Sequence, residues 1–144
     1  MYFLGTFDYA MDERGRVPLP PRYRDAFRAG AVLSHGSPNP CVRVYTQEAF
    51  DVMAAEAMAP SVMQQKGRDL RLALFSRCHP ADLDQQNRLL IPRELRDYAD
   101  LTAKVYIVGA GECLQIWEPS RYSAEMERID SSLASTMESL ADQR

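Results

Sequence analysis

Two short segments of the chain place an aspartate four residues before an arginine, at a turn. Asp12 precedes Arg16 in DERGR, and Asp84 precedes Arg88 in DQQNR. A carboxylate can accept hydrogen bonds from the backbone of a turn and can pair with a guanidinium across it. A guanidinium can also bind phosphate, or the O6 and N7 atoms of guanine in the major groove. Each segment therefore indicates either a braced structural turn or a contact to nucleic acid.

The first segment is richer in arginine than the second. Residues 12–28 carry five arginines against three acidic side chains, whereas residues 84–100 carry three arginines against four, and the whole chain has a net charge of −3. An exposed arginine is often only solvated, but a local cluster of arginines is typical of a phosphate-binding surface. Arg14, Arg16, Arg22, Arg24 and Arg28 are therefore candidates for contact with phosphates. The residues assigned to a structural turn motif are Asp12, Asp84, Asn87 and Arg88.

Other residues that could do chemistry form no recognisable site. Cys78 adjoins His79, and Cys41 and Cys113 lack the Cys-x-x-Cys or His-x-x-x-His spacing of a metal centre. We expect these cysteines to be buried apolar residues, and His35 to be a surface residue without a partner. The sequence has no glycine-rich phosphate loop and no Gly-x-Ser-x-Gly motif. We therefore expect a binding protein with no enzyme activity, no metal, no cofactor and no small-molecule substrate.

The chain contains an internal duplication. A shift of 72 residues, without a gap, aligns chemically similar residues in its two halves. The aligned pairs include Asp12 with Asp84, Arg16 with Arg88, Arg24 with Arg96, Ala31 with Ala103, and Cys41 with Cys113. Gly15 and Asn87 fall in equivalent turns, and glycine and asparagine are the residues that most readily adopt positive φ. One half is too small to bury a core alone, so the halves are expected to interlock.

Each half predicts the same order of elements. An alternating strand, in FLGTFDYAM or FSRCHPADL, leads through the turn into a second strand, a short helix and two further strands. Pro18 requires its strand to lie at an edge or to contain a break. One helix is expected to begin after Thr46, which would cap its N-terminus, and another after Ser61, the first residue of a Ser-x-x-Gln capping box. Apolar residues at helical spacing from 122 to 140 predict a C-terminal helix packed on its own domain or on a neighbouring subunit.

These patterns predict an α+β fold that is mainly β, with two pseudo-symmetric units. The predicted organisation is a first repeat at 1–50, a helical connector at 51–74, a second repeat at 75–122, and a C-terminal helix or tail at 123–144. No apolar run reaches the roughly 20 residues of a membrane span, and the N-terminal residues do not follow the pattern of a signal peptide. The odd number of cysteines, three, favours a reducing compartment. We expect a cytoplasmic protein without membrane contact.

The segments FLGTFDYAMDERGRVPLPPRYRDAF and DQQNRLLIPRELRDYADLTAKVYIVGAGECLQIWEPSRY resemble the MraZ family of bacterial transcriptional regulators. The resemblance covers about residues 1–122, in the family's order and spacing. It implies two tandem swapped-hairpin units of the AbrB/SpoVT type, also described as a double-split β-barrel. Family members bind G-rich direct repeats upstream of the division and cell-wall gene cluster, repress it together with their own gene, and assemble into rings.

The resemblance also implies roles for particular residues. The DNA-reading loop falls on Asp12, Gly15 and the flanking arginines, with Arg22 and Arg24 behind it. Arg14 stands where the family usually has lysine. In the second copy Gln86 and Asn87 replace the usual basic residue and glycine, so this copy is expected to assemble the fold or the ring. The expected partners are thus double-stranded DNA and further copies of the chain, at the nucleoid.

Two other classes of function stay open from the sequence. The chain could be an antitoxin-like module that binds DNA through the hairpin and a protein partner through the C-terminal helix. It could also be an assembly protein whose arginine-rich loop is only solvated.

Overall fold

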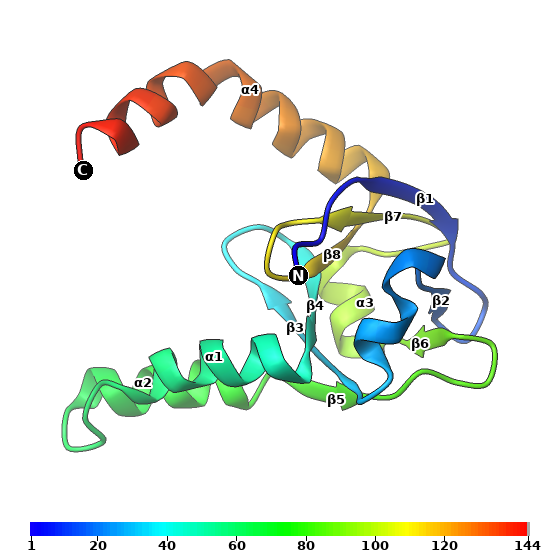
Figure 1. The fold of residues 1–144 in the computed structure, drawn as a ribbon, viewed down its shortest axis with the longest axis horizontal. Coiled ribbons are helices and arrows are strands. Elements are labelled where there is room, and N and C mark those ends of the chain that lie inside the picture. The colour runs from blue at the N-terminus through cyan, green and yellow to red at the C-terminus, as the bar shows by residue number, and fades with distance from the viewer. Residues whose placement is uncertain (144) are drawn as a thin grey trace.

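The computed structural model describes residues 1–143 and builds both halves of the chain into one α+β fold (Figure 1). The strands are β1 (Thr6–Ala10), β2 (Arg16–Pro18), β3 (Ala31–Gly36), β4 (Cys41–Thr46), β5 (His79–Ala81), β6 (Arg88–Leu90), β7 (Lys104–Gly109) and β8 (Leu114–Trp117). The helices are the 3₁₀ helix η1 (Pro21–Phe27), α1 (Gln47–Met58), α2 (Gln65–Phe75), α3 (Arg93–Ala99) and α4 (Pro119–Ala141). The predicted fold class, two swapped-hairpin units with flanking helices, is confirmed.

The two halves interlock by exchanging strands. A six-stranded antiparallel sheet has the order β1-β7-β8-β4-β3-β5, and β2 pairs with β6 in a separate ribbon. Strand β1 of the first half therefore pairs with β7 of the second half, while β5 of the second half pairs with β3 of the first. Each half thus completes the sheet of the other, which meets the requirement that neither half folds alone.

A pseudo-two-fold axis relates the halves. Val17 lies opposite Leu89 in the β2–β6 pair, and Arg43 lies opposite Gln115 in the β4–β8 pair. Both pairs join residues that are 72 positions apart in the sequence. A residue that faces its own repeat equivalent lies on the symmetry axis, so the axis passes through the centres of both strand pairs.

The gapless alignment of the two halves is wrong in the third strand of each unit. Leu33 lies opposite Val44, and Ile107 lies opposite Ile116. Since Val44 and Ile116 are repeat equivalents, Leu33 corresponds to Ile107, at a shift of 74 residues. The equivalent buried pairs are therefore Ala31 with Val105 and Leu33 with Ile107, whereas Ala103 is exposed. A shift of two residues keeps the same side chains on the inner face of the strand. The alternation of apolar residues therefore could not reveal the error in the alignment.

The core lies between the sheet and the β2–β6 ribbon. Fully buried side chains come from both halves: Val17, Leu19, Phe27, Leu33, Val42, Val44, Leu89, Ile91, Leu95, Ile107, Leu114 and Ile116. The ribbon has two edge strands, as Pro18 required. Bonds from the Leu19 amide to the Asn87 carbonyl and from the Ile91 amide to the Gly15 carbonyl frame the ribbon. Because hydrogen-bonded positions alternate, the nitrogen of Pro18 faces away from β6.

Two sequence predictions about α2 and its surroundings are wrong. Phe75 ends α2, so the second alternating segment forms only the three-residue strand β5, beginning at His79. The Ser-x-x-Gln capping box is absent, because Ser61 Oγ accepts the Met63 amide and α2 begins only at Gln65. A local turn at Ser61 therefore outcompetes the predicted cap. By contrast, Thr46 caps α1 as predicted, with its Oγ1 accepting the Ala49 amide at 3.1 Å.

The C-terminal helix α4 is anchored only near its beginning. Tyr122 packs edge-on against Tyr106 and Trp117, with ring centroids 5.6 and 5.9 Å away. Beyond that point α4 extends away from the sheet (Figure 1). Arg144, at the end of the predicted segment 123–144, lies outside the described residues. Within residues 1–143 no helix combines the length and apolar character of a membrane span.

Candidate nucleic-acid interface

Asp12 organises the first turn through both of its carboxylate oxygens. Its Oδ1 accepts the amides of Arg14 and Arg16, each at 2.9 Å, and its Oδ2 accepts Arg16 Nε at 2.7 Å. The backbone closes the turn with a bond from the Gly15 amide to the Asp12 carbonyl. The side chain of Arg16 is thereby held along the turn with 30% of its surface exposed. Arg14 projects at the exposed tip.

The second turn repeats this geometry. Asp84 Oδ1 accepts the amides of Gln86 and Arg88 at 2.8 and 2.9 Å, and Oδ2 accepts Arg88 Nε at 3.0 Å. The Asn87 amide closes the turn on the Asp84 carbonyl. Asn87 has φ 60°, where Gly15 has φ 84°. The two turns are thus the same structural device, and they differ in the residues presented at the tip.

The backbone amides stabilise the ionised form of both aspartates. The pKa of Asp12 is lowered chiefly by the amide of Arg16, with further help from the Arg16 side chain and the Arg14 amide. The pKa of Asp84 is lowered chiefly by the amide of Arg88. Both carboxylates are therefore charged at neutral pH, where they neutralise part of the adjacent guanidinium charge.

The two turns are linked to each other across the pseudo-symmetry axis. Arg88 Nη1 lies 3.5 Å from Asp12 Oδ2 in the opposite turn, in addition to its bond with Asp84. Arg88 is therefore shared between two carboxylates, whereas the ion pair of Arg16 is with Asp12. The guanidinium charge of Arg88 is more fully compensated than that of Arg16. The formal charge of the two turns is the same, because Glu13 balances Arg14, so the turns differ in the compensation of their arginines and not in net charge.

Gly15 is buried and packs against the Arg96 side chain of the second half. A Cβ atom at this position would lie 2.7 Å from Arg96 Nε, and that Nε has no hydrogen-bond partner within residues 1–143. Arg96 was not among the residues predicted for the site, although the 72-residue shift pairs it with the candidate Arg24. The tip of the first turn is therefore supported from beneath by the helix α3 of the other half.

Two further candidates lie on η1, beyond strand β2. Arg22 is exposed, while Arg24 is half-buried and donates from Nε to the Leu19 carbonyl at 3.0 Å. The structure thus brings Arg14, Gly15 and Arg16 together in one turn and places these two arginines on the following helix. The backbone bond of Arg24 ties one face of its guanidinium to the protein.

His35 is not the isolated surface residue that the sequence predicted. Its ring stacks on Tyr98 with centroids 4.1 Å apart, and its Nε2 lies 3.5 Å from Glu94 Oε1. The Nε2 of His79 lies 3.6 Å from the other oxygen of Glu94. Burial lowers the pKa of His35, against the opposing effect of Glu94. Histidines from the two halves therefore meet around one carboxylate, a contact that only the strand exchange creates.

Two of the three cysteines are buried, as predicted. Burial raises the pKa of Cys41 to about 12 and that of Cys113 to about 11, so both remain thiols at neutral pH. Neutral, buried thiols are poor nucleophiles and poor metal ligands. These two residues thus act as small apolar side chains beside the central strands.

The chain matches known proteins over nearly its whole length. The family described as "MraZ protein, putative antitoxin-like" matches residues 2–72 and again residues 74–144. A relative from Thermomicrobium roseum, named "Transcriptional regulator MraZ", is 33% identical over 127 residues, covering 88% of this chain and 89% of its own. Relatives of the same name from a Roseiflexus species and a Nocardioides species are 30% and 35% identical, over 142 and 122 residues. They cover 99% and 85% of this chain, and 99% and 84% of their own length.

Proposed function

This chain belongs to the MraZ family, as its motifs predicted, and we propose that it is a DNA-binding transcriptional regulator that contacts DNA through its first Asp-x-x-x-Arg turn. The observation that carries the proposal is the asymmetry between two turns of equal geometry. The first turn has Arg14 at its tip, and its Arg16 pairs with one carboxylate. The second turn has Gln86 at its tip, and its Arg88 pairs with two carboxylates. Phosphate and guanine recognition both favour the turn with the less compensated guanidinium charge.

The proposed roles of the two units follow from this asymmetry. The unit at 1–50 reads DNA with Arg14, Gly15 and Arg16, and Arg22 and Arg24 on η1 supply further positive charge. The unit at 75–122 completes the sheet and braces the first turn, through Arg88 on Asp12 and Arg96 beneath Gly15. The connector at 51–74 and the helix α4 carry none of these residues and are available for contacts between subunits.

Several subunits are proposed to act together on G-rich direct repeats. One turn per subunit makes a small contact, but linked subunits on successive repeats raise the effective concentration of each neighbour. A ring provides such linkage through one head-to-tail interface repeated until it closes. The proposed targets are the repeats upstream of its own gene and of the division and cell-wall cluster, where occupancy at the nucleoid represses transcription.

Paired substitutions in the two turns test the proposal. Arg16→Ala should reduce binding to a duplex of such repeats by about 1–3 kcal/mol per subunit and lower the salt slope by about 1 for each phosphate that it no longer binds. Arg88→Ala is the matched comparison, because it removes the equivalent side chain from a turn of the same geometry. It should cause a smaller loss, since it removes only the contact with Asp12 that braces the first turn. Gel shifts and fluorescence anisotropy at several salt concentrations measure both quantities. Equal losses from the two variants would remove the basis for assigning DNA contact to the first turn.

A second substitution separates charge from shape at the tip. Arg14→Gln makes the first tip resemble the second, while Gln86→Arg does the reverse. We expect Arg14→Gln to weaken DNA binding and Gln86→Arg to strengthen binding to any DNA sequence alike, since added charge alone carries no base readout. A Gln86→Arg variant that gained affinity only for the direct repeats would contradict the assignment of the second turn as scaffold.

The antitoxin-like alternative is favoured by the exposed distal half of α4, which a protein partner could cover. It predicts a stable complex with another protein that does not depend on Arg16. Co-purification of the full chain from its native cells, with Arg16→Ala beside it, distinguishes that function from the proposed one.

A further inference from the structure

A shallow apolar groove lies on the α1–α2 hairpin, on the other side of the molecule from α4 (Figure 1). Its lining residues are Val62, Arg68, Arg71, Leu72, Phe75 and Ser76. Leu72 is 71% exposed and Val62 is 56% exposed, although both are large apolar side chains. The groove therefore exposes apolar surface of the kind that protein partners cover.

Two arginines at the groove are held in place by the hairpin itself. Arg68 donates to the Val62 carbonyl at 2.9 Å, and Arg71 donates to the carbonyl and the sulfur of Met58 at 3.0 and 3.2 Å. The groove is thus lined by two fixed guanidinium groups and by no carboxylate of the described residues. Positive charge without a nearby carboxylate favours an acidic occupant of the groove.

The distal half of α4 has the complementary properties. Leu133, Met137 and Leu140 form one apolar stripe, and they are 43%, 63% and 56% exposed. Residues 129–143 contain three acidic side chains and no basic one, whereas residues 65–77, around α2, contain four basic side chains and one acidic one. An apolar stripe on an acidic helix thus matches an apolar groove lined by arginines.

The α4 of the same molecule does not occupy this groove. In Figure 1 α4 runs along the top of the molecule and the α1–α2 hairpin along the bottom; both extend to the left, and the distal end of α4 stays apart from α2. We propose that residues 129–141 of one copy pack into the α2 groove of a second copy. This inference rests on the self-association that forms part of the proposed function, and it names the two surfaces that make that contact.

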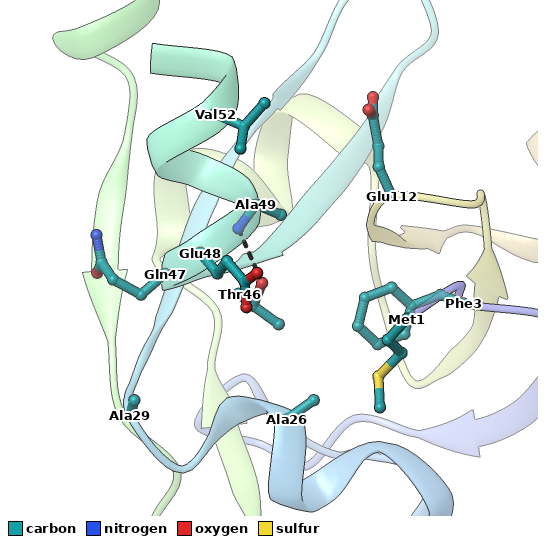
Figure 2. A pocket seen from close by; sticks show the side chains of 10 residues that line it. All are labelled: Met1, Phe3, Ala26, Ala29, Thr46, Gln47, Glu48, Ala49, Val52 and Glu112. Carbon is teal, nitrogen blue, oxygen red and sulfur yellow. Dashed lines mark hydrogen bonds between the residues drawn. The ribbon is translucent and has the colours of Figure 1, made fainter. Parts of the chain in front are cut away.

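The hollow in Figure 2 is a poor alternative site for α4. It lies between the N-terminal residues, η1 and the first turn of α1. Glu48 and Glu112 line this hollow, and two carboxylates there would repel the acidic helix. Val52 of α1, 62% exposed, also lines it, so this residue offers a substitution that tests the hollow separately from the groove.

A contact between two different surfaces has a definite consequence for assembly. Each copy presents one helix and one groove, so every added copy leaves one of each free until a ring closes. A contact between two α4 helices would instead stop at a dimer. The two arrangements therefore respond differently to mixing variants that lack one surface each.

Light scattering coupled to gel filtration tests the inference on the full-length chain. Leu72→Glu places a charge in the groove, and Met137→Glu places one in the α4 stripe. Because both side chains are mostly exposed, both variants should fold, which circular dichroism checks. Each alone should lose all species above the 16.3 kDa monomer. Mixed in equal amounts, they should form a species of twice that mass, since one intact helix and one intact groove remain.

Other results overturn the inference in distinct ways. If the Leu72→Glu variant assembles like the unmodified chain, the groove is not the contact site. If only Val52→Glu dissociates the assembly, the contact lies at the hollow of Figure 2 instead. A mixture that stays monomeric excludes pairing of the helix with the groove. Arg16→Ala, which leaves both surfaces intact, should assemble normally while losing DNA. Thus a failure of the DNA proposal is separable from a failure of this one.

Discussion

Gly15→Ala should destabilise the folded chain, because Gly15 has positive φ and packs against Arg96. Gly15 has φ 84°, in the left-handed region, where a Cβ costs about 1–2 kcal/mol relative to glycine. The added Cβ would also lie 2.7, 2.8 and 2.9 Å from Nε, Cζ and Cδ of Arg96. Overpacking of this kind costs about 1–3 kcal/mol, and the lower part of that range applies because Arg96 can shift. The sum predicts a decrease of about 2–4 kcal/mol in the free energy of unfolding.

The equivalent position in the second turn is the matched control. Asn87 has φ 60° and already carries a Cβ, so Asn87→Ala adds no atom and loses only the tolerance of asparagine for this conformation. We expect a cost of about 1 kcal/mol or less there. Urea unfolding followed by circular dichroism gives both values, and thermal unfolding should show about 2–4 °C for each kcal/mol.

A double-mutant cycle isolates the contact with Arg96. Arg96→Ala removes the atoms that the new Cβ would meet, so the double variant Gly15→Ala/Arg96→Ala should retain only the backbone strain. An equal cost for Gly15→Ala and Asn87→Ala, with no coupling to Arg96, would refute the view that the second half supports the first turn from beneath. DNA binding by Gly15→Ala should weaken as well, because the flanking arginines move with the displaced turn.

Three further predictions concern stability. Leu89→Ala removes a fully buried side chain and should cost about 2–5 kcal/mol in urea unfolding. Leu90→Ala, at the neighbouring exposed position, should stay within about 0.5 kcal/mol, and similar values for the two would contradict the burial of Leu89 under the β2–β6 ribbon. Thr46→Ala should lose about 1 kcal/mol by removing the cap on the Ala49 amide, and Thr46→Ser should keep it. Because burial lowers the pKa of His35, the unfolded chain takes up a proton near pH 6.5 before the folded one, so the melting temperature should fall as the pH drops below about 6.5. His35→Gln should flatten that dependence, and an unchanged slope would assign it to other groups.

Much of the fold followed from the sequence because its signals are local. The carboxylate and the arginine of each turn lie four residues apart, and the turn residue is glycine or asparagine where φ is positive. The Thr46 cap likewise joins residues three positions apart. The wrong prediction at Ser61 also concerned a local signal. The hydroxyl of Ser61 could cap a helix or accept the Met63 amide in a turn, and the sequence does not show which of the two bonds forms.

The duplication was visible in the sequence, but its exact register was not. Similar residues recur at a constant shift of 72 over most of each half, yet Leu33 corresponds to Ile107 at a shift of 74. The sequence pattern could not distinguish the two alignments, since a slip of two residues preserves which face of a strand is buried. Only the pairing of each strand with its neighbours settles the register.

The chemistry of the two turns, the duplication and the need for the halves to interlock could all be inferred from the amino-acid sequence. The folded structure sets which side chains come into contact across the two halves: Arg88 with Asp12, Arg96 with Gly15, and His35 and His79 with Glu94. These contacts differ from the local ones in their separation along the chain. A bond within a turn depends on a few backbone angles, whereas contacts between residues tens of positions apart exist only after strand exchange has closed the sheet.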